Sequence, residues 1–152
     1  MDPIKEATYM QVSDVMTPAV HYVHPEQTLR EIAIFMAELD VGALPVGEKN
    51  RLVGMITDRD IVIRGLAEGR DADTKVREVM TPHVKYCYAD EKIDHVAHNM
   101  GEIQVRRLPV MNRDKRLVGI LSLGDIATKR GPGVAGETIR HVSENREPEA
   151  AA

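Results

Sequence analysis

The 152-residue sequence has one cysteine, one phenylalanine, four tyrosines and no tryptophan. A single cysteine excludes a disulfide within the chain and is typical of a reducing cytoplasm, where we expect the protein to reside. So few aromatic rings offer no platform on which nucleic-acid bases would stack. The net charge of −4, with basic residues scattered among acidic ones, also argues against nucleic acid and anionic membranes as partners.

Other absences narrow the function further. No apolar run is long enough to cross a bilayer, and residues 1–10 lack the basic region and apolar core of a secretion signal. We find no Ser-His-Asp arrangement, no paired catalytic carboxylates and no Walker-type glycine loop, so we expect a protein that is not an enzyme. Cys87 stands in a β-rich segment, where a lone cysteine is usually a small buried hydrophobic residue rather than a nucleophile.

What the sequence does contain is an internal repeat, found by aligning the chain with itself. The segment VSDVMTPAV, beginning at Val12, recurs as VREVMTPHV beginning at Val76. The same shift aligns VGALPV with VRRLPV. After one extra residue in the second copy, RLVG at Arg51 recurs at Arg116. Two copies are too few for an open solenoid, so we expect a closed pair with pseudo-twofold symmetry.

Each copy predicts the same succession of elements: helix, strand, helix, two strands around a turn, and a closing helix. Thr28 is the expected cap of the long helix, and Asp90 is its counterpart in the second copy. The ranges expected in the first copy are residues 12–16, 19–23, 29–39, 43–46, 52–57 and 58–67.

This pattern predicts an α/β protein with two tandem domains, residues 8–70 and 71–131. Each would consist of a small sheet with flanking helices, and the two would be related by pseudo-twofold symmetry. The remaining tail, residues 132–152, follows a glycine-rich connection that we expect to be flexible. A short helix is predicted to begin in this tail at Glu137 or Thr138.

The most informative motif is GMITDRD at residues 54–60, which recurs imperfectly as GILSLGD at residues 119–125. In each, a hydroxyl residue at the expected strand-to-helix turn is followed three residues later by aspartate. A hydroxyl beside free N–H groups at a helix start favours an anion such as phosphate, and a carboxylate can accept hydrogen bonds from a ribose diol. The same spacing is also that of a capping box, which requires no ligand.

Two copies of MTP, a helix, LPV, and LVG followed by Thr or Ser and then Asp resemble the cystathionine-β-synthase (CBS) domain repeat. In that family, two domains pack as a Bateman module. The resemblance covers residues 12–130, and the chain is similar to small stand-alone bacterial CBS-pair proteins of the hypoxic response type. It implies two three-stranded sheets that pack face to face and leave two clefts. In many members those clefts bind AMP, ADP, ATP, NAD or S-adenosylmethionine.

The resemblance therefore implies a regulatory module that binds an adenosine nucleotide and acts in trans on an unknown protein target. Asp60 and Asp125 would hold ribose hydroxyls, while Thr57 and Ser122 would face phosphates with help from the helix N-termini. Only the first copy carries an arginine, Arg59, beside the phosphate position, so we expect the tighter site there. The residues that follow each MTP would line the adenine pocket: Ala19, Val20, His83 and Val84.

Alternatives to nucleotide binding remain open. In one, the protein is a structural or stress-response interaction protein whose hydroxyl–Asp pairs merely cap helices. In another, a metal site is formed by four residues of the second copy, His83, Cys87, His95 and His98. No CxxC or HExxH spacing supports that site, so we expect no metal and no required cofactor. Arg64 and Lys129, which match in the closing helices, could supply distant charge for phosphate, although solvated helix faces are the favoured expectation.

We also expect a homodimer, as the resemblance implies for such modules. The apolar residues of the predicted helices are more numerous than one small core needs, which suggests an interface between twofold-related copies. The residues on which this expectation depends are Ile32, Met36, Ile61, Met100 and Ile126.

Overall fold

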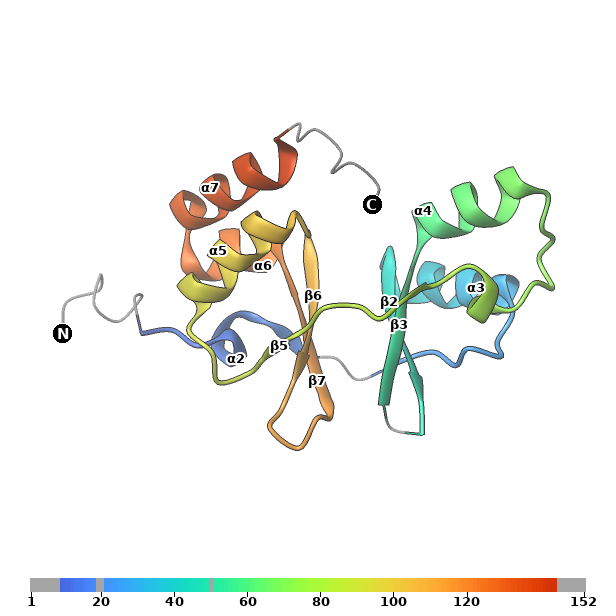
Figure 1. Ribbon diagram of the computed structural model, residues 1–152, viewed down its shortest axis with the longest axis horizontal. Helices are drawn as coiled ribbons and strands as arrows, with labels where there is room; N and C mark the ends of the chain where they lie inside the picture. Colours follow the sequence, from blue (N-terminus) through green and yellow to red (C-terminus); the bar gives the residue numbers. More distant parts are fainter. Residues whose placement is uncertain (1–8, 19–20, 50, 145–152) are drawn as a thin grey trace, which may run out of the picture. The chain divides into compact units, whose positions relative to one another are not determined.

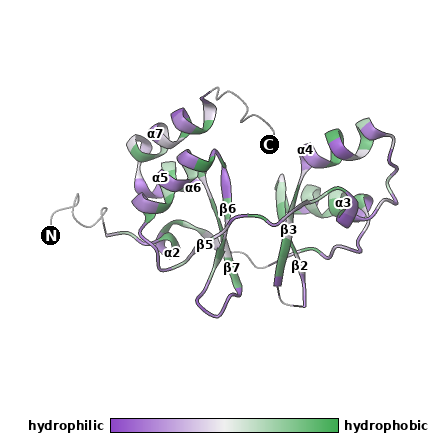
Figure 2. Cartoon of the chain, in the orientation of Figure 1, coloured by the Kyte–Doolittle hydropathy of each residue, from purple (hydrophilic) through white to green (hydrophobic). Residues whose placement is uncertain are grey.

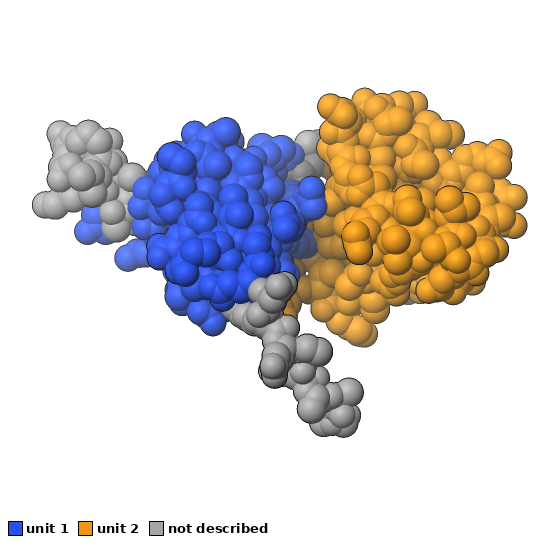
Figure 3. All heavy atoms as spheres, turned by 90° about the horizontal axis from the view of Figure 1, so that it is seen from above, with its two compact units in different colours: residues 1–18, 86–112, 118–152 blue, residues 19–85, 113–117 orange. Residues whose placement is uncertain are grey.

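The computed structural model describes residues 9–18, 21–49 and 51–144. They form two compact units, each with its own small sheet and flanking helices (Figure 1). Unit 1 consists of residues within 1–18, 86–112 and 118–152, and unit 2 of residues within 19–85 and 113–117, coloured blue and orange in Figure 3. The structure is therefore the mixed α/β architecture that the sequence predicts.

Unit 2 contains a three-stranded sheet in the order β2-β3-β4. Strands β2 and β3 form an antiparallel hairpin, and β3 also pairs with β4, where Gly54 lies opposite Pro82. The elements of this unit are α3 Leu29–Leu39, β2 Ala43–Glu48, β3 Arg51–Thr57, α4 Asp58–Asp60, η1 Ile61–Gly65, η2 Leu66–Glu68, η3 Val76–Glu78 and β4 Thr81–Pro82.

Unit 1 contains a four-stranded sheet in the order β1-β7-β6-β5, with β1 antiparallel to β7 and β5 parallel to β6. Its elements are α2 Val12–Val15, β1 Thr17–Pro18, β5 Cys87–Tyr88, α5 Ile93–Ile103, β6 Arg107–Met111, β7 Leu117–Ser122, α6 Leu123–Asp125, η4 Ile126–Arg130 and α7 Pro132–Ser143.

The segment that opens each repeat is exchanged between the two sheets. Thr17–Pro18, from the first repeat, pairs with β7 of the second repeat, and Thr81–Pro82, from the second, pairs with β3 of the first. The compact units consequently differ from the repeat-based domains 8–70 and 71–131, because each opening segment completes the sheet of the other repeat. The sequence repeat shows which segments are equivalent, whereas strand pairing decides which segments pack together.

Each unit has its own hydrophobic core. Figure 2 shows hydrophobic residues along β3 and on one side of the helices, where they face the sheets. The unit 1 core includes Met100 and Ile126, and the unit 2 core includes Ile32 and Met36, with Ile61 packed against its edge. These residues therefore give no evidence for a dimer interface, because they pack in two separate cores rather than in one. The homodimer itself stays a prediction.

Most predicted elements of the first repeat are confirmed. Thr28 caps α3, since its hydroxyl oxygen accepts from the N–H of Glu31 at 3.2 Å. The closing helix ends at Gly69, which adopts a φ of 80°, but it is a short α-helical turn followed by π-helical and 3₁₀ segments. Within the expected strand 19–23, Ala19 and Val20 lie outside the described residues, and Val23 forms an isolated bridge with Val46.

Two expectations for helix starts were wrong. Asp90 does not cap α5, which begins at Ile93 after Lys92. The tail helix α7 begins five residues earlier than the predicted Glu137, at Pro132, because proline is well suited to the first turn of a helix. The glycine-rich connection is therefore partly helical.

Helix α7 is fastened to α5 by several polar contacts. The Thr138 hydroxyl donates to the carbonyl oxygen of Ala97 at 3.2 Å, and the Gln104 amide donates to the carbonyls of His141 and Glu144 at 3.0 and 2.9 Å. The His141 carbonyl also accepts from the Glu144 N–H at 3.3 Å, so the Gln104 amide adds a second bond there and binds the carbonyl of the residue just after the helix. Helix α7 is thus a packed part of unit 1.

Glycine is required at the two points where the exchanged segments cross the sheets. A Cβ atom on Gly54 would lie 2.7 Å from the carbonyl oxygen of Thr81, and one on Gly119 would lie 2.9 Å from that of Thr17. The sulfur atoms of Met80 and Met16 would also clash with the Cβ atoms added at Gly54 and Gly119, respectively. Because the clashing atoms belong to the backbone, a side chain at either glycine would displace the exchanged segment.

We expect Gly54→Ala and Gly119→Ala each to lower the free energy of unfolding by about 1–3 kcal/mol, the usual cost of overpacking. The matched control is Gly136→Ala in α7, where an added Cβ would meet nothing within 4 Å. That substitution should be stabilising by about 0.5–1 kcal/mol, because alanine favours the helix. Urea denaturation of the three variants measures this. Equal stabilities for Gly54→Ala and wild type would contradict the close approach.

Candidate ligand-binding sites

The pair Thr57 and Asp60 forms a reciprocal capping box at the start of α4. The Asp60 N–H donates to Thr57 Oγ1 at 3.0 Å, and the Thr57 N–H donates to Asp60 Oδ2 at 3.0 Å. This arrangement fixes the threonine and the aspartate in one rigid turn at the end of β3. Both side chains are half-buried.

Ser122 and Asp125 form the same box in unit 1. The Asp125 N–H donates to Ser122 Oγ at 3.1 Å, and the Ser122 N–H donates to Asp125 Oδ2 at 3.0 Å. Helix capping, the alternative that requires no ligand, is therefore realised in both copies. Each box engages only one oxygen of its aspartate.

The second oxygen of each aspartate has different surroundings in the two units. Asp125 Oδ1 accepts a hydrogen bond from the Thr17 hydroxyl at 3.1 Å. Asp60 Oδ1 accepts from no described residue of the chain. Among the described residues, the unit 2 carboxylate therefore has an oxygen that no side chain engages, whereas both oxygens of the unit 1 carboxylate already accept one hydrogen bond.

A cation from each closing helix reaches toward the exchanged segment of its own unit. In unit 2, the Arg64 guanidinium donates to Thr81 Oγ1 at 3.3 Å. In unit 1, Lys129 Nζ lies 3.5 Å from the carbonyl oxygen of Met16. Both cations stand in π-helical segments, which are frequent at functional sites. The expectation that they lie only on solvated faces is therefore incomplete.

Thr17 and Thr81 are site neighbours that the sequence reasoning missed. Both belong to the repeated MTP motif, which was available as a signal. Their proximity to the closing helix of the other repeat follows from the strand exchange, and no local pattern in the sequence indicates that exchange.

The helix starts offer fewer free donors than expected. In α4, the N–H of Asp58 donates to the Gly42 carbonyl at 2.9 Å, and that of Arg59 donates to Asp58 Oδ1 at 2.8 Å. The Asp60 N–H is already used by Thr57. The first three N–H groups are thus occupied, so an anion there would depend on side chains. The expected help from the helix N-termini in binding phosphate is not supported by free N–H groups in α4, and for both turns it stays a prediction.

The remaining expected residues are only partly placed. The Arg59 side chain is exposed in the turn next to Asp60. His83, exposed and with a φ of 54°, and the half-buried Val84 follow β4 in unit 2, the unit that also holds Thr57. Ala19 and Val20 lie outside the described residues, so their expected place in an adenine pocket stays a prediction.

The four residues considered for a metal site do not gather. His83 belongs to unit 2, whereas Cys87 is buried in β5 of unit 1 and His95 and His98 are exposed on α5. Across residues 9–18, 21–49 and 51–144, no group of three or more His, Cys, Asp or Glu side chains is arranged to hold a metal ion. The His95 ring instead contacts the Asn99 amide at 3.2 Å.

Cys87 is the small buried residue that its surroundings in the sequence predict. It is 4% exposed, and its Sγ lies 3.9 Å from the carbonyl oxygen of Pro109. Burial, together with the charge of Glu91, raises the pKa of the Cys87 thiol to about 12. The thiol is therefore protonated at neutral pH and is a poor nucleophile.

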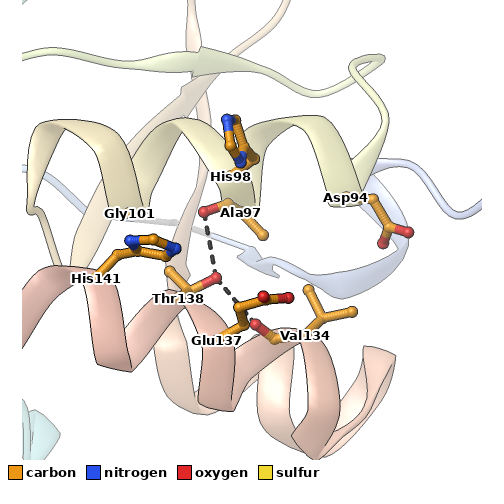
Figure 4. Close-up of a pocket in the computed structure, with 8 residues that line it drawn as sticks. All are labelled: Asp94, Ala97, His98, Gly101, Val134, Glu137, Thr138 and His141. Carbon is orange, nitrogen blue, oxygen red and sulfur yellow. Dashed lines mark hydrogen bonds between the residues drawn. The ribbon is translucent and has the colours of Figure 1, made fainter.

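A groove of about 340 Å³ lies between α5 and α7 in unit 1 (Figure 4). Asp94, Ala97, His98 and Gly101 line it from α5, and Val134, Glu137, Thr138 and His141 from α7. Figure 4 shows the Thr138 hydroxyl between the two helices, bonded to Ala97 and to Val134. Asp94 is held by a bidentate ion pair with Arg130 at 2.7 and 2.9 Å, which raises the pKa of that guanidinium. The groove thus marks where α7 docks.

Within the part of the chain that the structure describes, no helix is long and apolar enough to cross a membrane.

The fold and the paired turns define the class of protein. The CBS domain model matches residues 12–66 and 76–130, and the chain belongs to the CBS domain family. Among curated relatives, the CBS domain-containing protein YhcV of Bacillus subtilis is 40% identical over 133 residues, covering 87% of this chain and 94% of its own. Hypoxic response protein 1 of Mycobacterium tuberculosis is 45% identical over 116 residues, covering 75% and 80%.

Solved structures give the same result. The crystal structure of Hypoxic Response Protein I with two coordinated zinc ions matches at 43% identity and a TM-score of 0.70, covering 78% of this chain and 98% of that one. The CBS domain pair of protein MJ0100, in complex with 5-methylthioadenosine and S-adenosyl-L-methionine, has 29% identity and a TM-score of 0.71, covering 79% and 94%. CBSX2 in complex with AMP has 28% identity and a TM-score of 0.67, covering 86% and 98%.

We expect Cys87 to resist iodoacetamide at pH 8 in the folded protein and to react readily once guanidinium unfolds it. A pKa raised from 9.0 to about 12 leaves about a thousandfold less thiolate, and burial blocks access as well. The control is Ile139→Cys, which places a second thiol at a position 42% exposed on α7. Mass spectrometry should find only the second thiol labelled; rapid labelling of Cys87 would contradict the burial.

The same shift predicts a loss of stability in alkali. Above pH 9 an unfolded thiol loses its proton while the folded one keeps it, so the folded state binds more protons and stability falls as pH rises toward 12. Urea midpoints measured between pH 8 and pH 11 should therefore fall more steeply for wild type than for Cys87→Ala. Parallel slopes would count against this linkage.

Proposed function

We propose that this protein is a regulatory module that binds an adenosine nucleotide of the AMP, ADP, ATP or NAD type and acts in trans on a protein target. Two of the solved neighbours hold ligands that share an adenosine moiety, AMP in one and methylthioadenosine with S-adenosylmethionine in the other. An adenosine moiety carries a ribose diol, whose hydroxyls can donate to the aspartate carboxylates of the two turns. No catalytic residue is assigned.

The observation that carries this proposal is that the two oxygens of the Asp60 carboxylate have different surroundings. Its Oδ2 is committed to the Thr57 N–H, which orients the group, and its Oδ1 has no partner among the described residues. A carboxylate held in this way is preorganised to accept a ribose hydroxyl, because its side chain loses little conformational entropy on binding. The exposed guanidinium of Arg59 and the Arg64–Thr81 pair supply positive charge and a hydroxyl for phosphate.

The unit 1 turn is proposed as the weaker site. There the second carboxylate oxygen of Asp125 already accepts from Thr17, and Gly124 stands where unit 2 has Arg59. A ligand hydroxyl would have to share this oxygen with the threonine or displace it, and displacement costs the bond that is replaced.

The second candidate function is a structural or stress-response interaction protein that binds no nucleotide. One observation favours it: both capping boxes are complete with protein groups alone. In that case the aspartates stabilise helix starts and nothing more.

Substituting Asp60→Asn separates these two functions. Asparagine keeps one oxygen for the Thr57 N–H, but an NH₂ group and a neutral charge replace the free acceptor. A hydrogen bond to a charged group contributes about 1.5–3 kcal/mol, so we expect isothermal titration with AMP and ATP to show about tenfold to hundredfold weaker binding. Asp125→Asn should weaken binding less.

The matched control is Asp14→Asn, because Asp14 Oδ2 accepts from the Gln11 N–H at 2.9 Å in the same geometry at the start of α2. It loses one charge from a capping box that lies at neither site, and should leave affinity unchanged. If wild type produces no heat with millimolar nucleotide, the interaction protein replaces the sensor. If both variants weaken binding equally, the role given to Asp60 fails.

A further inference from the structure

Helix α7 covers a face of α5 that has no such cover in the other repeat. Ala97 is 1% exposed and Gly101 is buried beneath α7, whose Thr138 hydroxyl donates to the Ala97 carbonyl. At the equivalent positions of α3, Ala33 and Ala37 are exposed. Figure 1 shows α7 lying along α5, and no described helix takes the matching position on α3. A helix of this kind therefore keeps its place in the fold without a cover.

The sequence of α7 is unfavourable for a helix on its own. Gly133 and Gly136 lie inside it, and a Cβ added to either would meet nothing within 4 Å, so packing requires neither glycine. Glycine is the weakest helix former after proline, and Gly131 before the helix provides no side-chain cap. A helix of 12 residues is marginal in water even with a better composition. Helix α7 therefore depends on its contacts with the rest of unit 1.

Those contacts bury few side chains. Ala135 and Thr138 are the buried residues of α7, at 1% and 4% exposed, and both are small. Helix α5, by contrast, buries Ile93, Val96 and Met100. The groove of about 340 Å³ also leaves part of the α5–α7 interface unfilled (Figure 4). Because elements with few buried apolar contacts open most easily, α7 can leave unit 1 at a much smaller cost than α5.

The start of α7 is joined to the turn that carries Asp125. The Gly131 N–H donates to the carbonyl oxygen of Ile126 at 2.9 Å, so the helix begins directly on segment η4. Leu123 and Ile126, on either side of Asp125, belong to the same hydrophobic cluster as Ala135. Undocking α7 would remove Ala135 from that cluster and weaken the packing that supports the turn.

We propose that α7 is a detachable cover: it undocks from α5 as a unit while both cores stay folded, and its docking is coupled to the Ser122–Asp125 turn. Release uncovers Ala97 and Gly101, so that unit 1 then presents the small-residue face that α3 presents without a cover. Coupling is reciprocal, so whatever stabilises the turn also favours the docked helix. The cover requires no ligand, and it rests on the proposed function only in that this turn is also the proposed weaker site.

Amide hydrogen exchange of the full chain, measured by mass spectrometry, tests whether α7 opens alone. After correction for intrinsic rates, peptides within residues 132–143 should exchange at least about a hundredfold faster than those of β7. Exchange of both at one rate would mean that α7 opens only when the whole unit unfolds, and would overturn the proposal.

Variants of α7 should change this exchange in opposite directions. Thr138→Val keeps the shape but removes the hydroxyl bond to α5, and should speed the exchange of α7 by about fivefold. Replacing Gly133 and Gly136 together by alanine should slow it by about tenfold. The control Ser143→Ala removes an exposed hydroxyl of the same helix and should not speed it. Equal exchange in Thr138→Val and wild type would contradict the docking contact.

The coupling has its own test in a matched pair of variants. Ser122→Ala removes the hydroxyl that accepts from the Asp125 N–H, and should speed the exchange of α7 by about twofold to fivefold. Thr57→Ala removes the equivalent hydroxyl in unit 2, where no described helix takes the matching position, and should leave the exchange of α7 unchanged. If Ser122→Ala has no effect, or if both variants speed the exchange equally, the coupling is refuted.

Discussion

The close backbone approach at Gly54 and Gly119 is the contact on which the rest of the structure depends. At each glycine, a carbonyl of the exchanged Thr-Pro segment crosses a strand at a distance that no side chain would permit. This crossing joins the opening segment of one repeat to the sheet of the other. It also completes each core, since Val12 and Val15 enter one cluster and Val76 and Val79 enter the other.

The candidate sites are a consequence of that exchange. The turn that carries Asp60 comes from one repeat, and Thr81, to which Arg64 donates, comes from the other. The capping box orients the Asp60 carboxylate through one oxygen, and the second oxygen has no partner among the described residues. Under the proposed function, capping and ligand recognition would use different atoms of the same side chain, so a complete capping box fits both the binding module and the interaction protein.

Helix α7 breaks the equivalence of the two repeats. It lies outside the residues matched by the family model, and it covers on α5 the surface that α3 leaves exposed. The Thr138 and Gln104 bonds hold this helix against α5, and the ion pair of Arg130 with Asp94 holds the preceding segment η4 to the same helix. The difference between the repeats is therefore concentrated in their outer helix faces rather than in their cores.

The sequence alone determined the repeat, the α/β class, the family, the cap at Thr28 and the hydroxyl–Asp turns, because each of these is encoded by residues close together in the chain or by direct self-similarity. It also indicated a buried Cys87. Only the tertiary structure decided the strand exchange, the second threonine at each turn, the start of α7 and the exposure of Ala33. Those features depend on contacts between segments far apart in the sequence. Ala33 and Ala97 are identical residues at equivalent positions, so the sequence repeat does not indicate which of them a neighbouring helix covers.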